Sequence, residues 1–470
     1  MVIKSNWVSD AIFYQIFPDR FYNGNLKNDP PGIVQWGSSP TRNNFFGGDL
    51  EGIKKKLSYL KEIGINAIYL NPIFKAGTNH KYDTWDYYEV DPIFGSKSDL
   101  LNLIKEIHKL KMKVMLDGVF NHCGNSFWAF RDVKEKGIHS SYYNWFIING
   151  DSISEKPINY QTAGGAKYLP KFNYNNKLVR EYILKIAEYW TKEAEIDGWR
   201  IDIPWKVPMD FWQIFRKKVK KINPDAYIVG EIWRDASPWI KGDTFDGVMN
   251  YRLRDLVIDF LIKDSIDAED FDYELSYLRE LHNFNAYLML NLLSSHDVPR
   301  ILSIANNDIK KLTMSVVFLM TYIGAPMIYY GDEVGMEGEN DPDCRRTMIW
   351  DKSLWNKEIN DMYRKLIRFR IEHESLRSGS FKTLFVFNRL YVYQRSKGLD
   401  KVIIVLNPGE KQDKVKVPLK KDVIFYKSWV DLFTENKYKV TGDCLEIKNL
   451  PGLSALVLKP RKTKSKNCVA

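Results

Sequence analysis

Eight short apolar runs, separated by segments with helical spacing, recur along this chain of 470 residues. Strands that alternate with helices pair in parallel, because each crossover helix returns the chain to the same end of the sheet. Eight such units close a (β/α)8 barrel, so the sequence predicts an α/β protein built on one. The runs are Ala11 to Phe17, Ala67 to Asn71, Val114 to Phe120, Gly198 to Ile203, Tyr227 to Trp233, Gly247 to Tyr251, Leu288 to Ser294 and Met327 to Asp332.

Charged residues interrupt two of these runs. Arg200 and Asp202 are two residues apart, so they project from one side of the strand and the guanidinium can hold the carboxylate ionised. A buried ionised aspartate is a candidate nucleophile, although a structural ion pair would have the same pattern. In the next run Glu231 lies among apolar and aromatic neighbours, where desolvation favours its protonated form and suits it to general acid catalysis. Trp233 shares its face and offers a flat surface for a sugar ring.

Polar residues also end two other runs. One run ends at His296 and Asp297, and the other ends in the segment from Asp117 to His122. Each pattern is weak by itself. Four apolar runs that finish in hydrogen-bonding residues are typical of a barrel whose strand ends carry the chemistry.

The four segments, in this order and at these separations, resemble the characteristic regions of the α-amylase superfamily, glycoside hydrolase family 13, over roughly residues 10 to 350. The resemblance implies that Asp202 is the nucleophile, Glu231 the acid and base, and Asp297 the acid that binds and distorts the sugar in the reactive subsite. The resemblance also implies further sugar-binding residues: Arg200, His122, His296, Tyr82 with His80 beside it, Trp233, Asp341 and Arg345.

The string Leu169 to Asn173 resembles a motif of neopullulanases, cyclomaltodextrinases and maltogenic amylases, and Asp341 to Arg346 points the same way. Those enzymes usually carry an N-terminal β-domain, whereas the barrel here begins within the first dozen residues. The oligomeric state, monomer or homodimer, therefore stays open.

Asparagine, aspartate and glycine cluster before the second run and supply the hard oxygen ligands that calcium prefers. Such turns are usually only turns. In cyclodextrin-processing relatives these positions resemble a structural Ca²⁺ site, here formed by Asn23, Asn25, Asn28, Asp29, the Gly47 carbonyl and Asp49. A second calcium site of secreted amylases uses a histidine after the nucleophile, where this chain has Trp205 and Lys206, so that site is not expected.

The chain organisation follows from loop lengths and periodicity. A helix is expected from Asp99 to Leu110, capped by Ser96 or Ser98, and another from Asn356 to Glu374. We expect a catalytic barrel from residues 1–122 and 176–378, an inserted subdomain at 123–175, a C-terminal antiparallel β-sandwich at 379–460 and a basic tail at 461–470. Strands of the sandwich are expected at Leu390 to Arg395, Lys401 to Leu406, Val423 to Tyr426 and Ser454 to Leu458.

Composition excludes several classes. The net charge is +10, but much of the excess lies in the final dozen residues, so nucleic acid is not an expected partner. Four dispersed cysteines, Cys123, Cys344, Cys444 and Cys468, suggest neither disulfides nor zinc, and no apolar run is long enough to span a membrane. Without a recognisable leader, a cytoplasmic protein is expected.

Together these features predict a retaining hydrolase of α-1,4-glucosidic bonds in cyclodextrins and maltooligosaccharides, with some cleavage of pullulan and starch and some transglycosylation. No organic cofactor is required. A 4-α-glucanotransferase or a general α-amylase would use the same residues. A non-catalytic relative that serves as a binding subunit is the alternative from another class, and its catalytic carboxylates would be missing.

Overall fold

The computed structural model describes residues 7–419, 423–424 and 426–461. Eight parallel strands form one sheet in the order β8-β7-β6-β5-β2-β1-β10-β9. A parallel bridge between Met249 and Leu290 joins the two outermost strands, so the sheet closes into the expected barrel. The barrel strands are β1 (Phe13–Ile16), β2 (Ala67–Leu70), β5 (Lys113–Gly118), β6 (Gly198–Ile201), β7 (Tyr227–Gly230), β8 (Gly247–Val248), β9 (Leu290–Asn291) and β10 (Ala325–Tyr329).

Strand alternation divides the buried residues between two cores. Phe13 and Tyr69 pack inside the barrel, whereas Tyr14 and Ile68 face the surrounding helices. The α-helices of this region are α1 (Trp7–Asp10), α2 (Pro18–Phe21), α3 (Leu50–Ile63), α4 (Lys97–Lys109), α6 (Lys177–Glu193), α7 (Met209–Ile222), α8 (Tyr251–Leu261), α9 (Ala268–His282), α10 (Ile301–Ile304), α11 (Ile309–Thr321), α12 (Lys357–Glu372) and α13 (Glu374–Ser378).

The helix ends follow local capping chemistry. Ser96, not Ser98, caps α4, because its hydroxyl accepts the Asp99 N–H while the Asp99 carboxylate accepts the Ser96 N–H. Asn356 caps α12 by a single bond, in which its side-chain oxygen accepts the Ile359 N–H. The helix expected from Asn356 to Glu374 is divided at His373, which separates α12 from α13.

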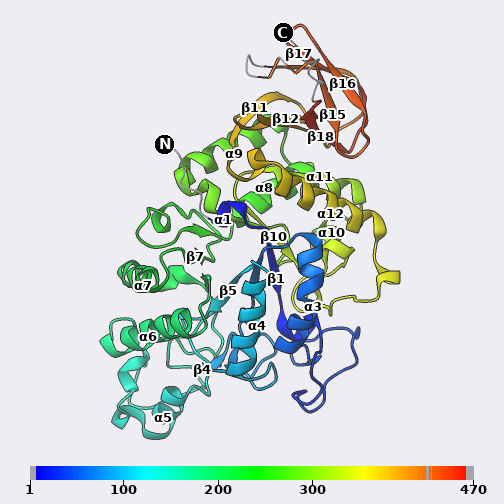
Figure 1. Cartoon of the computed structure of the whole chain (residues 1–470). Helices are drawn as coiled ribbons and strands as arrows, with labels where there is room; N and C mark the ends of the chain where they lie inside the picture. The colour runs from blue at the N-terminus through cyan, green and yellow to red at the C-terminus, as the bar shows by residue number, and fades with distance from the viewer. Residues whose placement is uncertain (1–6, 420–422, 425, 462–470) are drawn as a thin grey trace.

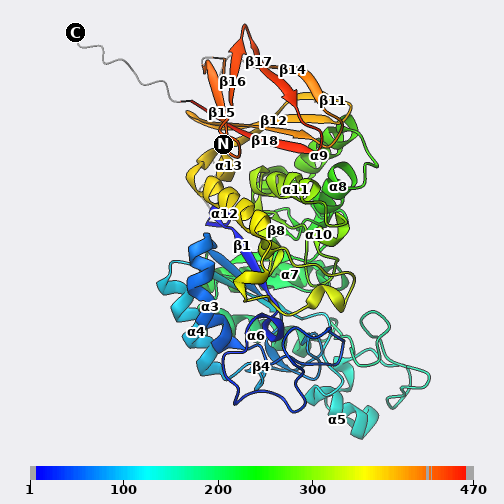
Figure 2. The same cartoon turned by 90° about the vertical axis from the view of Figure 1, so that its right-hand side faces the viewer.

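Strands β3 (Phe74–Ala76) and β4 (Thr84–Val90) form a hairpin after β2. The long segment after β5 contains α5 (Trp128–Lys136), which lies at one end of the molecule in both views (Figure 1, Figure 2). This inserted segment is tied to the barrel by a bridge between His122 and Lys171.

The C-terminal strands lie at the opposite end of the molecule from α5 (Figure 1). They form one antiparallel sheet in the order β11-β12-β13-β18-β15-β16-β17-β14. Val392 and Ile403 from one half and Val417 and Leu445 from the other share a core, so the sheet folds over itself as the expected sandwich. The strands are β11 (Ser380–Phe387), β12 (Leu390–Lys397), β13 (Asp400–Asn407), β14 (Gln412–Pro418), β15 (Ser428–Asp431), β16 (Lys437–Thr441), β17 (Cys444–Leu450) and β18 (Ser454–Pro460).

One expected strand is wrong. Val423 and Ile424 form a turn, and the neighbouring strand starts later, at Ser428. The apolar pattern there reflects burial of Val423 in the sandwich core rather than pairing in the sheet. Residues 462–470 of the expected basic tail, including Cys468, lie outside the described residues. Within the described part of the chain, Cys123, Cys344 and Cys444 are free thiols, and no helix is long and apolar enough to cross a membrane.

Candidate active site

A cleft of about 490 Å³ opens at the carboxyl ends of the barrel strands, where the inserted segment meets them. Leu169 and Tyr168 form its wall on the side of the inserted segment. Its remaining lining includes most of the residues expected to act on a sugar: Tyr82, His122, Asp202, Glu231, Trp233 and Asp297. Side chains that are far apart in the sequence therefore meet at one place, as parallel strand ends require.

Arg200 is the centre of the charged cluster below this cleft. Its side chain is fully buried, and its guanidinium lies 2.9 Å from Asp202, 3.0 Å from Asp117 and 2.9 Å from Glu231. The register of the sheet explains the first contact across strands, because Asp117 of β5 lies opposite Arg200 of β6. One positive charge is thus shared by three carboxylates.

Strands β6 and β7 end earlier than the sequence pattern indicates, and this determines where Asp202 and Glu231 lie. β6 ends at Ile201 and β7 at Gly230, so Asp202 and Glu231 lie just beyond the sheet. Ile203 has a φ of 37°, which is rare for a β-branched residue. This turn directs the Ile203 N–H to Glu231 Oε2 at 3.2 Å.

The surroundings of Glu231 differ from the apolar ones expected from its sequence neighbours. Arg200 Nη2 lies 2.9 Å from Oε2, and the Trp233 indole N–H donates to Oε1 at 2.8 Å. The apolar residues of the run are buried on other sides, whereas the carboxylate meets a cation and two N–H donors. Glu231 is nevertheless almost fully buried.

Asp202 uses its two oxygens differently. Arg200 binds Oδ1, while Oδ2 is buried and has no hydrogen-bond partner. Burial raises the pKa of Asp202 well above its ordinary value, Arg200 opposes that rise, and the charge of Glu231 adds to it. Because one guanidinium serves three carboxylates, it does not hold each of them ionised, in contrast to the simple pairing expected from the sequence.

Asp297 lines the same cleft and is held by two neighbours. His296 Nε2 lies 3.1 Å from Oδ2, and Arg345 Nη2 lies 3.6 Å from Oδ1. Burial and the nearby charge of Glu231 raise the pKa of Asp297 to about 7. The cluster of acids therefore retains a proton nearer to neutral pH than isolated carboxylates would.

The pair of Asp341 and Arg345 forms as expected, with 2.9 Å between Oδ1 and Nη1. It is not a surface salt bridge, because the Arg345 side chain is almost fully buried. Arg345 also donates from Nε to the carbonyl of His296 at 2.8 Å. The loop after β10 thus fixes the position of both His296 and Asp297.

The expected histidines are neutral supports around Tyr82. His80 accepts the Tyr82 N–H at 3.1 Å, and His122 Nε2 lies 3.0 Å from the Tyr82 carbonyl. Burial lowers the pKa of His80 to about 3 and that of His122 to about 4. The Tyr82 ring stacks on His296 with 5.4 Å between centroids, so its position at the base of the cleft is fixed from three sides.

Trp233 lies beside Glu231, although neither residue belongs to β7, the strand whose alternation was expected to place them on one face. One face of its ring stacks on Tyr251 at 3.7 Å, and the side chain is 42% exposed at the cleft. The uncovered face is available to a flat ligand.

Four residues that organise the base of the site were given no role from the sequence, although Asp117 lies in one of the four segments that carry the resemblance. Tyr69 donates to Asp117 at 2.6 Å, and Tyr82 donates to the same carboxylate at 2.9 Å. Gln15 contacts His296 at 2.8 Å, and Asn71 donates to Tyr82 at 3.1 Å. Three of the four, Gln15, Asn71 and Asp117, are polar residues within or at the end of an apolar strand, which was the available signal.

The residues expected to bind calcium lie together beside the start of α3. Asn23 Nδ2 donates to Asp29 Oδ1 at 2.7 Å, and Asp49 accepts the Gly24 and Asn25 N–H groups. Asn23 Oδ1 and Asn28 Oδ1 are buried without partners, and a hard cation would satisfy both.

The same site has a close approach that only glycine permits. A Cβ on Gly47, whose φ is 80°, would lie 2.5 Å from both Asn23 Nδ2 and Asp29 Oδ1. Among the described residues no group of three or more His, Cys, Asp and Glu side chains could hold a metal ion. The expected calcium ligands include only two such side chains, Asp29 and Asp49, and the other donors are amide and backbone oxygens. The residues present therefore fit a calcium ion.

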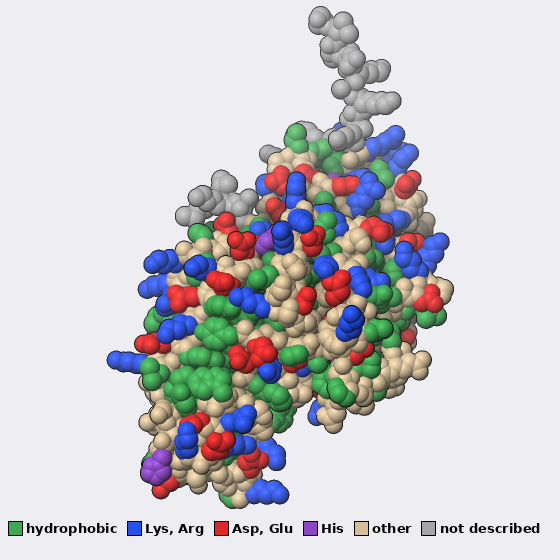
Figure 3. Space-filling view, turned by 60° about the horizontal axis from the view of Figure 1, so that its bottom comes forward, with side chains coloured by type: hydrophobic (Ala, Val, Ile, Leu, Met, Phe, Trp, Pro, Cys, Tyr) green, Lys and Arg blue, Asp and Glu red, His purple; other side chains and the backbone are tan. Residues whose placement is uncertain are grey.

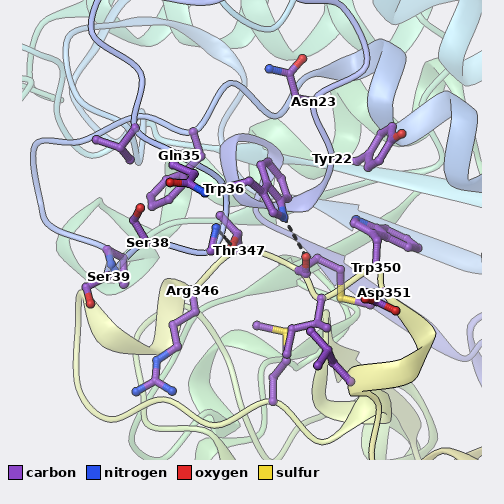
Figure 4. Close-up of a pocket in the computed structure, with 18 of the residues that line it drawn as sticks. Tyr22, Asn23, Gln35, Trp36, Ser38, Ser39, Arg346, Thr347, Trp350 and Asp351 are labelled. Atoms are coloured by element: carbon purple, nitrogen blue, oxygen red, sulfur yellow. Dashed lines mark hydrogen bonds between the residues drawn. The ribbon is translucent and has the colours of Figure 1, made fainter.

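A larger groove, of about 1090 Å³, lies elsewhere, between the segment around Trp36 and the segment after β10. Two of its polar side chains already have partners: the Trp36 indole N–H donates to the Met348 carbonyl (Figure 4), and Arg346 is bound by Asp343. None of the expected catalytic acids lines it. The smaller cleft with its charged cluster is therefore the candidate active site.

The surface charge is mixed rather than gathered. Figure 3 shows basic and acidic side chains interspersed over the face in view. On the described residues of this face there is no broad patch of one sign of the kind that binds a phosphate backbone.

The chain matches a known family along most of its length. Residues 15–373 match the profile described as the α-amylase catalytic domain. The chain is 45% identical over 425 residues to a cyclomaltodextrinase of Thermoanaerobacter pseudethanolicus, covering 89% of this chain and 74% of that protein. It is 44% identical over 436 residues to neopullulanase 2 of Thermoactinomyces vulgaris, covering 91% and 74%.

Solved structures agree with the sequence matches. The ligand-free cyclic α-maltosyl-(1→6)-maltose hydrolase of Arthrobacter globiformis superposes with a TM-score of 0.89 at 38% identity, covering 97% of this chain and 100% of that one. A solved cyclomaltodextrinase gives a TM-score of 0.91 at 40% identity over 96% of this chain and 78% of that one.

Proposed function

Because the chain belongs to the α-amylase family, glycoside hydrolase family 13, we propose that it hydrolyses α-1,4-glucosidic bonds of cyclodextrins and maltooligosaccharides with retention of configuration. The observation that carries the proposal is the pair of buried carboxylates, Asp202 and Glu231, held on one guanidinium at the wall of a single cleft. Two adjacent carboxyl groups of this kind are what retaining glycosidases use.

The chemistry divides between the two acids. Asp202 Oδ2, which has no hydrogen-bond partner, attacks C1 of the sugar while Glu231 gives a proton to the leaving glycosidic oxygen. Glu231 then removes a proton from a water molecule whose oxygen attacks C1, and the bond between C1 and Asp202 breaks, which regenerates the Asp202 carboxylate. The proton returns to Glu231, so the cycle closes without an organic cofactor.

Asp297 and its partners have a binding role in this scheme. The carboxyl group lines the same cleft as Asp202 and Glu231, where it can bind hydroxyl groups of the reacting sugar. Arg345, His296 and the more distant Asp341 keep it in place. Tyr82 and His122 complete the lining on the side of β2 and β5.

The substrate class rests on two kinds of support. Relatives with more than 40% identity are named cyclomaltodextrinase, neopullulanase and maltogenic α-amylase. The cleft is small and is walled by Leu169 and Tyr168 of the inserted segment, which favours short or cyclic chains over polymer. We expect maltose and glucose as main products.

The test is a product profile on β-cyclodextrin, maltotriose, pullulan and soluble starch with the purified protein. Higher kcat/KM on β-cyclodextrin than on starch supports the proposal. An equal or higher value on starch would make a general α-amylase the better description. No cleavage of any of the four would refute the proposed function.

Transfer to a second sugar is the alternative outcome of the same intermediate. The exposed face of Trp233 beside Glu231 favours it, because an incoming sugar can stack there whereas water needs no platform. Incubation with maltotriose separates the two activities. A predominance of products longer than the substrate identifies a 4-α-glucanotransferase, whereas a predominance of shorter products identifies a hydrolase with a lesser transfer activity.

A calcium ion would be held by Asn23, Asn25, Asn28, Asp29, the Gly47 carbonyl and Asp49. When bound, it would supply structural cross-linking of the loop to the start of α3 and no chemistry at the cleft.

We also propose a cytoplasmic protein that acts as a monomer or homodimer. A relative named intracellular maltogenic amylase, from Bacillus subtilis, supports that compartment, as do the free thiols of Cys123, Cys344 and Cys444.

A further inference from the structure

The imidazole of His296 is fully buried behind Tyr82 and Asp297, two residues that line the cleft, and its two nitrogens meet different partners. Nε2 is 2.6 Å from the Tyr82 hydroxyl and 3.1 Å from Asp297 Oδ2. Nδ1 is 2.8 Å from Gln15 Nε2. A neutral imidazole carries one proton, so the choice of nitrogen decides whether the ring donates to the cleft or presents a lone pair to it.

The directions of the neighbouring hydrogen bonds settle that choice. The Asp117 carboxylate accepts from Arg200, from Tyr69 and from the Tyr82 hydroxyl. The single proton of Tyr82 is therefore used on Asp117, and the Tyr82 oxygen acts as an acceptor toward His296. Asp297 Oδ2 is an acceptor as well. Both contacts require an N–H at His296 Nε2.

The other nitrogen, Nδ1, must then be unprotonated. Burial, Arg345 and Arg200 lower the pKa of His296 well below its ordinary value, so the ring holds one proton only. Its Nδ1 needs a donor, and the Gln15 amide supplies one from a fully buried position. The second N–H of that amide goes to Asn71 Oδ1 at 3.0 Å, and Asn71 in turn donates to Tyr82, so the chain of bonds has one consistent direction.

We propose that Gln15 is a positioning residue that holds His296 in the tautomer with the proton on Nε2. Gln15 lies on β1, two residues after Phe13 and one layer nearer the cleft inside the barrel. Its Oε1 is buried and has no hydrogen-bond partner. A buried amide oxygen without a partner destabilises the fold, so the side chain serves here through its N–H groups.

The catalytic consequence rests on the proposed function. With an unprotonated Nε2, the single lone pair of that nitrogen would face the Tyr82 oxygen and the Asp297 carboxylate, and the repulsion would displace these two residues of the cleft. Residues that orient metal-bound histidines through hydrogen bonds are typically worth about 10- to 100-fold in activity, and we apply the same range to Gln15 as the partner of His296. We expect a loss of that size in kcat, with a smaller change in KM.

The experiment combines ¹⁵N spectra of the histidine rings with kinetics on β-cyclodextrin. The chain has only 7 histidines, so a sample labelled at histidine gives a simple spectrum, and His296→Gln identifies the resonances of His296. The variants are Gln15→Met, which keeps the shape and removes the donor, and Gln15→Glu, which replaces the donor by an acceptor. Gln394→Met is the control, because Gln394 is a buried glutamine of β12 remote from the cleft.

The wild-type ring is expected to show the proton on Nε2. Gln15→Glu should move it to Nδ1 or give an imidazolium, Gln15→Met should make a second tautomer detectable, and both should lower kcat at least 10-fold. Gln394→Met should change neither. A proton on Nδ1 in the wild type, or a wild-type spectrum together with wild-type kcat in Gln15→Met, would overturn the proposal. Absence of any α-glucan cleavage by the wild type would refute the proposed function and leave the tautomer result intact.

Discussion

Replacement of Arg200 by methionine tests whether one guanidinium neutralises the acids of the cleft. Arg200 is fully buried and lies within 3.0 Å of Asp117, Asp202 and Glu231. Removal of one partner of a buried ion pair costs about 3–5 kcal/mol, because the remaining charge is buried without compensation. With three carboxylates affected, we expect a loss of about 5 kcal/mol in the free energy of unfolding at pH 8.

The loss should shrink as the pH falls. Burial raises the pKa values of Asp117 and Asp202 and Arg200 opposes that rise, so without Arg200 these two folded-state pKa values rise further above their unfolded values. An acid with a raised folded pKa stabilises the fold fully below its unfolded pKa, and that contribution is lost as the pH rises through the folded pKa. If the folded variant holds one more proton than the wild type, the difference changes by about 1.4 kcal/mol per pH unit. Between pH 8 and pH 5 this amounts to about 4 kcal/mol.

The assay is chemical unfolding of wild type and Arg200→Met at pH 5 and pH 8. Arg370→Met is the matched control, because Arg370 is equally buried but donates to the carbonyls of Met320, Tyr322 and Gly324, which do not titrate. Burial lowers the pKa of Arg370 to about 9, so it stays charged over this range. The control should lose the same free energy at both pH values. An equal loss at both pH values in Arg200→Met would refute the shared-charge argument.

Three further predictions concern chemistry, metal and transfer. Asp202→Asn and Glu231→Gln should each lower turnover on maltooligosaccharides by at least about 10²-fold with an unchanged circular dichroism spectrum; residual turnover above a tenth of wild type would exclude the role. Exhaustive chelation should lower the melting temperature, and Asn28→Ala should remove this effect of chelation; an unchanged melting curve with no metal detected in the wild type would eliminate the calcium site. Trp233→Ala should reduce transfer products relative to hydrolysis products of maltotriose, and an unchanged ratio would show that the ring does not receive the incoming sugar.

The sequence by itself predicted the barrel and the presence of a C-terminal antiparallel domain, although it misplaced one strand of that domain. Apolar runs of strand length at regular intervals predicted the parallel barrel, and polar residues at their ends predicted where the site lies. The physical reason is that both signals are local: burial on both faces makes a barrel strand apolar, and only its carboxyl end reaches the cleft. Asp202, Glu231 and Asp297 could be found in this manner because each ends such a run, and the C-terminal strands at Leu390 and Lys401 followed from alternation.

Only the tertiary structure decided which groups share charges and protons. The apolar neighbours of Glu231 in the sequence suggested a desolvated acid, but Arg200, from the adjacent strand, lies 2.9 Å from it. Gln15 reads as an exception within an apolar strand until the barrel brings it to His296, 281 residues later. The direction of each hydrogen bond and the sharing of the Arg200 charge among three carboxylates depend on residues from several strands. The order of residues along the chain does not give the distances between those strands in a closed sheet.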